Sequence, residues 1–270
     1  MYQISVTVSV FVIVYSIENI HELNNYWKVK ANFELIWTDQ RLKMQNLNKN
    51  RNRNLLTNQE RNLIWIPEVM FSNNQLQNRL VVDSNAEVTV DRTQNKPTIS
   101  RYQDLNNALI YDGKLNEMNY NRTFSEQFEC NFDLQNYPFD IQLCHMNLTV
   151  PIAVSERVKL TAKGITYLGP KVLHQFEVVN NFSLTWPNQA QFSMTFRRLY
   201  DYNLISVYIP SNFLLCISLI TNYSSIQHFE ANIMVHLTTM LVMYTLLQAI
   251  SVSLPQVRIE INLSFLNINF

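Results

Sequence analysis

Cys130 and Cys144 are the residues of this sequence whose type and spacing most directly allow a covalent reaction. They enclose thirteen residues in the segment CNFDLQNYPFDIQLC, and the chain of 270 residues contains three cysteines in all. A disulfide between them would close a short loop and restrict the unfolded chain by about 3 kcal/mol in the chain-entropy model. Taken alone, the pair is compatible with a bridged hairpin in a secreted protein and with two free thiols in a cytosolic one.

The segment inside this pair contains the sequence Asn136-Tyr137-Pro138-Phe139-Asp140. Asparagine and proline favour a turn, and the proline biases the preceding tyrosine toward an extended conformation. We therefore expect a compact loop whose tip is apolar, formed by Tyr137, Pro138 and Phe139.

Two histidines, His145 and His174, raise the possibility of proton or divalent metal binding. Imidazole titrates near neutral pH and is a common zinc ligand. Neither histidine belongs to an HxH or CxxC spacing, so structural or solvated histidines are the alternative, and the identity of any metal is left unknown.

The composition excludes several classes of function. Lysine plus arginine equal aspartate plus glutamate, at 21 each, so no basic field exists for nucleic acid. The three glycines, Gly113, Gly164 and Gly169, are too far apart to build a phosphate-binding loop. No nucleophile with its base, no paired carboxylates and no metal-ligand cluster can be assembled from motif spacing, so we expect neither an enzyme nor a cofactor.

Alternating apolar residues predict two long strands, from Ile4 to Val14 and from Trp27 to Trp37, each with one buried face. No basic residue precedes the first, which argues against a signal peptide, and we expect the domain to begin further upstream. Shorter strands are expected at 79–90, 107–111, 122–130, 141–150, 156–163, 174–184 and 190–198. Many short strands separated by turns predict an all-β sandwich over residues 1–203.

Two uncharged segments follow, at 204–223 and 231–254, and each is long enough to cross a bilayer. Pro210 lies near the start of the first, and His236 is the only ionisable interruption of the second. One helical face of the second segment repeats at spacings of four and three and carries Met234, Thr238, Leu241, Thr245, Gln248 and Val252. Polar groups on such a face fit a pore lining with an apolar constriction, and equally fit helix-to-helix packing.

Together these pieces resemble the Cys-loop family of pentameric ligand-gated ion channels. The motifs that carry the resemblance occur in the family's order, from about Ile4 to Pro255: WTDQRL at 37–42, WIPE at 65–68, the Cys130-to-Cys144 loop with YPFD at 137–140, YIPS at 208–211, and LTTML at 237–241 leading to SLP at 253–255. The resemblance implies an extracellular immunoglobulin-like sandwich followed by transmembrane helices, of which only two of the family's four are present here.

The resemblance also implies how such a subunit works. Five subunits, identical or related, form a ring in the plasma membrane, a synaptic membrane being one setting, and a small-molecule or ionic agonist binds between neighbouring extracellular domains. The disulfide-bridged loop, with Tyr137, Pro138, Phe139 and Asp140, is then the element that couples the sandwich to the helices. The second helix, beginning near Glu230, is then the pore lining.

The agonist positions depart from those of family members that bind quaternary amines. Those members surround the cation with aromatic rings, whereas the corresponding positions here are Asn32, Ser72 and Pro151. Only a late hairpin with Trp186 and Phe192 could supply rings, and Asn32 and Glu34 point toward a subunit interface. Acetylcholine is therefore disfavoured as the agonist.

Ion selectivity and the end of the chain are the remaining departures. Many anion-selective members carry Pro-Ala-Arg where this chain has Glu230-Ala231-Asn232, and a ring of Glu230 carboxylates could attract cations. The surrounding residues nevertheless resemble divergent invertebrate glutamate-, proton- and zinc-gated chloride channels, so we expect an anion-type subunit, with a cation-conducting subunit as an alternative.

Residues 256–270 form a divergent tail, which predicts a truncated product, and a non-conducting, assembly-modulating protein is a further alternative.

Overall fold

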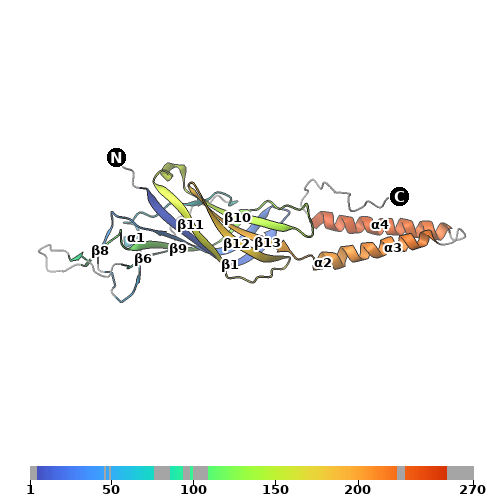
Figure 1. Ribbon diagram of the computed structural model, residues 1–270, viewed down its shortest axis with the longest axis horizontal. Coiled ribbons are helices and arrows are strands. Elements are labelled where there is room, and N and C mark those ends of the chain that lie inside the picture. Colours follow the sequence, from blue (N-terminus) through green and yellow to red (C-terminus); the bar gives the residue numbers. More distant parts are fainter. Residues whose placement is uncertain are drawn as a thin grey trace.

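A computed structural model describes residues 5–45, 47–48, 50–75, 86–93, 98–99, 109–223 and 229–253. The molecule is elongated, with a β domain at one end and two long helices at the other (Figure 1).

The larger sheet has six strands in the order β11-β1-β2-β9-β6-β4. Strands β1 and β11 pair in parallel, and the other neighbours are antiparallel. Their bounds are β1 Val6–His21, β2 Tyr26–Trp37, β4 Arg53–Leu55, β6 Ala86–Asp91, β9 Glu117–Glu129 and β11 Val158–Tyr167.

The second sheet has four strands in the order β12-β13-β10-β5, all antiparallel. Its strands are β5 Met70–Phe71, β10 Ile141–Thr149, β12 Phe176–Trp186 and β13 Gln189–Arg198. A small third sheet pairs β3 Lys43–Gln45, β8 Leu109–Asp112 and β7 Thr98–Ile99. Two short helices, α1 Asn58–Arg61 and the 3₁₀ turn η1 Ile152–Val154, lie in the connections.

The core lies between the two main sheets, and the alternation of β2 confirms which face is inward. Its apolar residues Trp27, Val29, Ala31, Phe33, Leu35 and Trp37 are all buried, as are Val8, Val10, Val12 and Val14 of β1. Rings from both sheets meet there: Phe33 of β2 lies edge-on to Phe71 of β5 at 6.1 Å between centroids. These contacts explain why an alternating sequence forms strands here, because only that period buries one face against a second sheet.

The predicted strands largely match those observed, with shifted ends. Strand β9 begins at Glu117, five residues before the predicted start at 122, and β11 extends to Tyr167 instead of ending at 163. Residues 79–85 and 107–108 of two predicted strands lie outside the described part of the chain.

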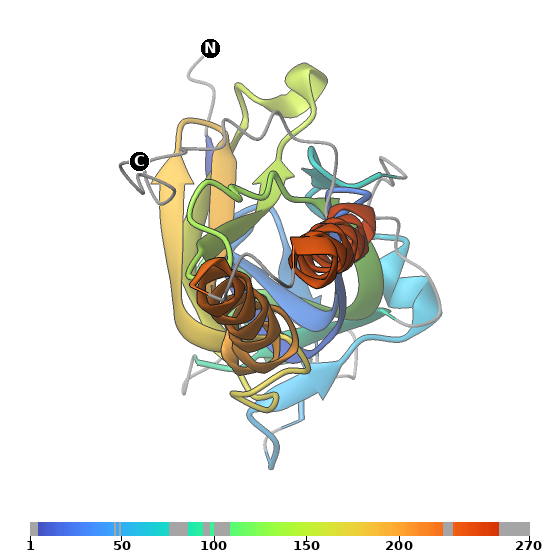
Figure 2. The same ribbon diagram turned by 90° about the vertical axis from the view of Figure 1, so that its right-hand side faces the viewer.

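The helical part consists of α2 Asp201–Asn203, the π-helical turn η2 Leu204–Tyr208, α3 Ile209–Asn222 and α4 Phe229–Ser253. Helices Asp201–Asn222 and Phe229–Ala249 are both long and apolar enough to cross a membrane. Figure 2, seen from the helix end, shows α3 and α4 side by side in front of the sandwich. Pro210 occupies the first turn of α3, where its missing N–H is tolerated. Leu254 and the expected tail at 256–270 lie outside the described residues.

Candidate coupling and ligand site

Cys130 and Cys144 are joined by a disulfide, and both are buried. Cys130 follows the end of β9, which belongs to the larger sheet, and Cys144 lies in β10 of the second sheet. The bridge therefore ties the two sheets together at the base of the loop that carries Tyr137, Pro138 and Phe139.

A buried ion cluster holds this loop against the last strand. Arg198, the final residue of β13, donates from Nε to Asp140 Oδ1 at 2.6 Å and from a terminal nitrogen to Oδ2 at 3.0 Å. The same terminal nitrogen lies 2.6 Å from Oε1 of Glu22, which is in the turn between β1 and β2. The side chains of all three residues are nearly inaccessible to solvent, at 4% for Arg198, 2% for Asp140 and 9% for Glu22.

Aromatic rings complete the surroundings of the guanidinium. Its Cζ atom lies 4.8 Å from the ring centre of Tyr137 and 4.7 Å from that of Phe176. Burial alone would lower the pKa of Arg198, but the hydrogen bonds and charges of Asp140 and Glu22 raise it above its ordinary value. Burial also raises the pKa of the Tyr137 phenol. The arginine is thus held charged between two carboxylates and two rings.

The tip of the loop points toward the start of the helices. The ring of Phe139 is 60% exposed and lies 5.1 Å from the ring of Tyr200, two residues after Arg198. Behind the tip, Gln142 is hydrogen bonded to the backbone of Asp133 through both ends of its amide, at 2.7 and 2.9 Å. A rigid base and an exposed tip are what a contact element requires.

Asn32 and Glu34 lie on the polar face of β2, away from the core. Asn32 Nδ2 donates to Asn121 Oδ1 at 3.1 Å. Glu34 accepts a hydrogen bond from Asn119 and lies 3.6 Å from Arg53. This face therefore offers amides, a carboxylate and a guanidinium to a polar ligand.

The other ligand-site candidates adjoin the end of β10 but differ in exposure. The N–H of Ser72 donates to the carbonyl of Asn147, the N–H of Val150, next to Pro151, donates to the carbonyl of Asn188, and Trp186 and Thr149 both pair with Gln189. Ser72 follows β5 and is exposed, Pro151 is buried before η1, and Trp186 is 55% exposed at the end of β12. Phe192 corrects the sequence prediction: its ring is fully buried in the core, so it has no surface to present to a ligand.

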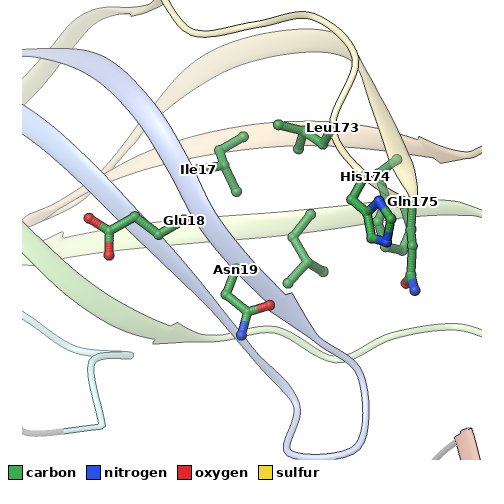
Figure 3. A pocket seen from close by; sticks show the side chains of 8 residues that line it. Ile17, Glu18, Asn19, Leu173, His174 and Gln175 are labelled. Atoms are coloured by element: carbon green, nitrogen blue, oxygen red, sulfur yellow. The ribbon is translucent and has the colours of Figure 1, made fainter.

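The two histidines lie apart. His145 Nδ1 is 2.8 Å from Ser193 Oγ, and burial lowers the pKa of this histidine. His174 lines a small pocket of about 230 Å³ between the end of β1 and the segment before β12, with Ile17, Asn19 and Gln175 (Figure 3). Among the described residues, no group of three or more metal-ligating side chains is present, so neither histidine belongs to such a group.

The predicted pore-lining face of α4 is open to the outside in a single subunit. Glu230, Met234, Thr238, Leu241, Thr245 and Gln248 are all exposed, while the side chain of Val252 lies outside the described residues. The hydroxyls of Thr238 and Thr245 donate hydrogen bonds to backbone carbonyls of their own helix, at 2.9 and 2.8 Å. The remaining lone pairs of the two hydroxyl oxygens can then accept hydrogen bonds from groups beside the helix.

Sequence reasoning missed Arg198 and Glu22. A signal for Arg198 exists, because it continues the inward alternation of Phe192, Met194 and Phe196, and an arginine on a buried face needs an acidic partner. Glu22 lies in a turn with no comparable local pattern.

The chain's similarity to known proteins agrees with this arrangement. Residues 2–185 match the family model described as the neurotransmitter-gated ion-channel ligand binding domain. The chain therefore belongs to this family, the Cys-loop receptors, whose members are ligand-gated ion channels and not enzymes.

Individual relatives are more distant. A glutamate-gated chloride channel of Drosophila melanogaster is 24% identical over 254 residues, covering 90% of this chain and 50% of the relative. The serotonin-gated chloride channel mod-1 of Caenorhabditis elegans is 23% identical, covering 79% and 42%. A gamma-aminobutyric acid receptor subunit beta of Lymnaea stagnalis is 22% identical, covering 93% and 51%. The chain thus spans about half the length of the curated relatives it matches.

Proposed function

We propose that this chain is a subunit of an agonist-gated anion channel in the plasma membrane, in which agonist binding to the sandwich opens a pore lined by α4. The observation that carries the proposal is the buried cluster around Arg198. It joins the β1–β2 turn, the disulfide-bridged loop and β13 within three residues of the first helix.

The cluster offers a physical route for the signal. Strand β13 ends at Arg198 and α2 begins at Asp201, so a shift of this strand moves the start of the helices directly. Because Arg198 is bonded to both Asp140 and Glu22, the loop and the turn must move with it. The Phe139 ring, in contact with Tyr200, then presses on the same junction.

The assignment divides the chain into an extracellular ligand-binding domain, residues 1–203, a membrane part, residues 204–255, and a tail, residues 256–270. The spans expected at 204–223 and 231–254 correspond to η2 with α3 and to α4 Phe229–Ser253. The subunit assembles with four copies of itself or of related subunits. Polar side chains at Asn32 and Glu34 favour a small polar agonist at the interface between sandwiches.

The pore assignment is supported by the open face of α4. Leu241 stands midway between Thr238 and Thr245 on this face and is 63% exposed. A ring of five such leucines would form an apolar constriction that closes by dewetting. The names of two relatives specify chloride, which favours anions, whereas the exposed Glu230 at the start of α4 favours cations.

Current recording tests the proposal. The chain is expressed alone and within the longest transcript that contains it, and glutamate, serotonin, gamma-aminobutyric acid, acid and zinc are applied in turn. An agonist-evoked current whose reversal potential follows chloride is the expected result. A reversal potential that follows sodium overturns the anion assignment, and the E230Q variant then shows whether Glu230 is responsible. Subunits that reach the surface but pass no current with any of these agonists overturn the channel assignment in favour of an assembly-modulating role.

A further inference from the structure

His236 is the one histidine of α4, and it faces α3 instead of the predicted pore side. Its Nδ1 atom lies 2.8 Å from Ser218 Oγ. Its Nε2 atom lies 3.1 Å from Asn222 Oδ1 and 3.5 Å from Thr221 Oγ1. Three oxygen-bearing side chains from the C-terminal end of α3 therefore surround one imidazole. An ionisable group at membrane depth is expensive unless it faces protein or water, so its placement points to a role.

The partners define the protonation state of the ring. The amide oxygen of Asn222 can only accept a hydrogen bond. The hydroxyl hydrogen of Thr221 is donated to the carbonyl of Ser218 at 2.8 Å, so toward the ring Thr221 Oγ1 can only accept. Nε2 must therefore carry a hydrogen, and in the neutral ring Nδ1 accepts from the Ser218 hydroxyl. The side chains thus select the tautomer protonated at Nε2.

We propose that His236 is a proton-binding site that joins the two membrane helices, a role that rests on α3 and α4 lying in a bilayer but not on channel activity. A proton added at Nδ1 turns this nitrogen into a donor, and Ser218 Oγ becomes the acceptor after its hydroxyl rotates toward a carbonyl of its own helix. Nε2 keeps its bonds. The ring can therefore gain a charge without losing a partner.

The end of α3 also suits a cation. Helix α3 ends at Asn222, and the last turn of a helix carries free carbonyls with partial negative charge. No charged side chain faces the ring from α3, whose only titratable residue is the exposed Cys216. On α4 the other titratable side chains are Glu230, six residues before, and Tyr244, eight residues after. His228 lies outside the described residues.

Protons can reach the site from the end of the hairpin. His236 is seven residues beyond Phe229, which is about 10 Å along the helix. Hydrogen bonds with a charged donor are roughly twice as strong as neutral ones. Acidification should therefore tighten the contact between α3 and α4 near this end.

Nuclear magnetic resonance of the full chain tests the site directly. The chain is labelled with nitrogen-15 histidine and placed in lipid nanodiscs, and the ring signals lost in H236Q are assigned to His236. We expect one protonated nitrogen, Nε2, in alkaline solution, and two after acidification, with the helices intact. The S218A variant should populate both neutral tautomers, S218T should restore one, and the matched control S211A, on the same helix but away from the ring, should change nothing. A ring that stays neutral throughout, or a tautomer unaltered by S218A, overturns the proposal.

A distance measurement tests the consequence for the hairpin. A spin label on Cys216, the only free cysteine of the three, is paired with one on L237C. The distance distribution should narrow on acidification, and this narrowing should vanish in H236Q and persist in the controls H228Q and H174Q. The proposal is overturned if the distance distribution still narrows on acidification in H236Q, or if it does not narrow in the parent protein. Neither experiment depends on current, so failure here is distinct from failure of the proposed channel.

Discussion

Replacing Arg198 by methionine should cause the largest loss of folding stability among single changes at the junction. The variant R198M leaves the carboxylates of Asp140 and Glu22 buried without a cation, while the methionine fills part of the space. Removing one partner of a buried ion pair typically costs about 3 to 5 kcal/mol. With two carboxylates left unpaired, the upper part of this range, about 4 to 5 kcal/mol, is expected, which for a domain of this size lowers the midpoint of thermal unfolding by about 8 to 20 °C.

The assay is thermal unfolding of the full chain in nanodiscs, followed by tryptophan fluorescence. Arg197 provides the matched control, because it adjoins Arg198 on the same strand but its ion pair with Glu177 is solvent-exposed, with 56% of the arginine side chain accessible. The variant R197Q should therefore unfold close to the parent. The triple variant E22Q/D140N/R198M, which removes the stranded charges, should recover part of the loss. Equal midpoints for R198M and R197Q would refute the reasoning.

Three further predictions concern the loop and the second sheet. Because Phe139 is mostly exposed, F139S should abolish agonist-evoked current while surface expression and thermal stability stay near those of the parent; equal loss of expression and current would contradict this. Replacing Cys130 and Cys144 by serine should reduce the free energy of unfolding by about 3 kcal/mol, measured by urea denaturation, and no loss would argue against the bridge as a stabiliser. Burial lowers the pKa of His145 below its ordinary 6.5, so the unfolded chain binds the proton more readily and stability falls as pH drops below about 6.5; H145Q should flatten this part of the stability curve, and an unchanged slope would exclude His145 as its source.

Much of the sandwich could be predicted from the sequence because its signal is local. The period of two from Trp27 to Trp37 requires no knowledge of a partner, and every apolar residue of that run is buried. The pairing of β1 with β11 is different. Val6 lies opposite Val158 in a parallel ladder, and no property of either segment specifies a partner about 150 residues away. Strand existence was thus predictable, whereas sheet order was not.

The candidate site shows the same division. An apolar loop tip was predicted from the residue types at 137–139, but only Phe139 is exposed, because Tyr137 packs on Arg198 and Pro138 is buried. Phe192 was assigned to a ligand surface because of its ring, although Ala190, Met194 and Phe196 at alternate positions already indicated an inward face. The partnership of Arg198 with Glu22 joins residues that are 176 positions apart, and only the folded structure brings them together.

The π-helical turn η2 determines which side of α3 meets α4. A π turn holds one more residue than an α turn, so the helix beyond it is rotated by about 100° relative to an uninterrupted α-helix. Here the wider turn spans Leu204–Tyr208, and the N–H of Ile209 bonds to the carbonyl of Leu204. Removing one residue from this turn would restore a plain α-helix and swing Ser218 away from His236. The π-helical turn therefore sets which face of α3 contacts α4, separately from how the sandwich is oriented.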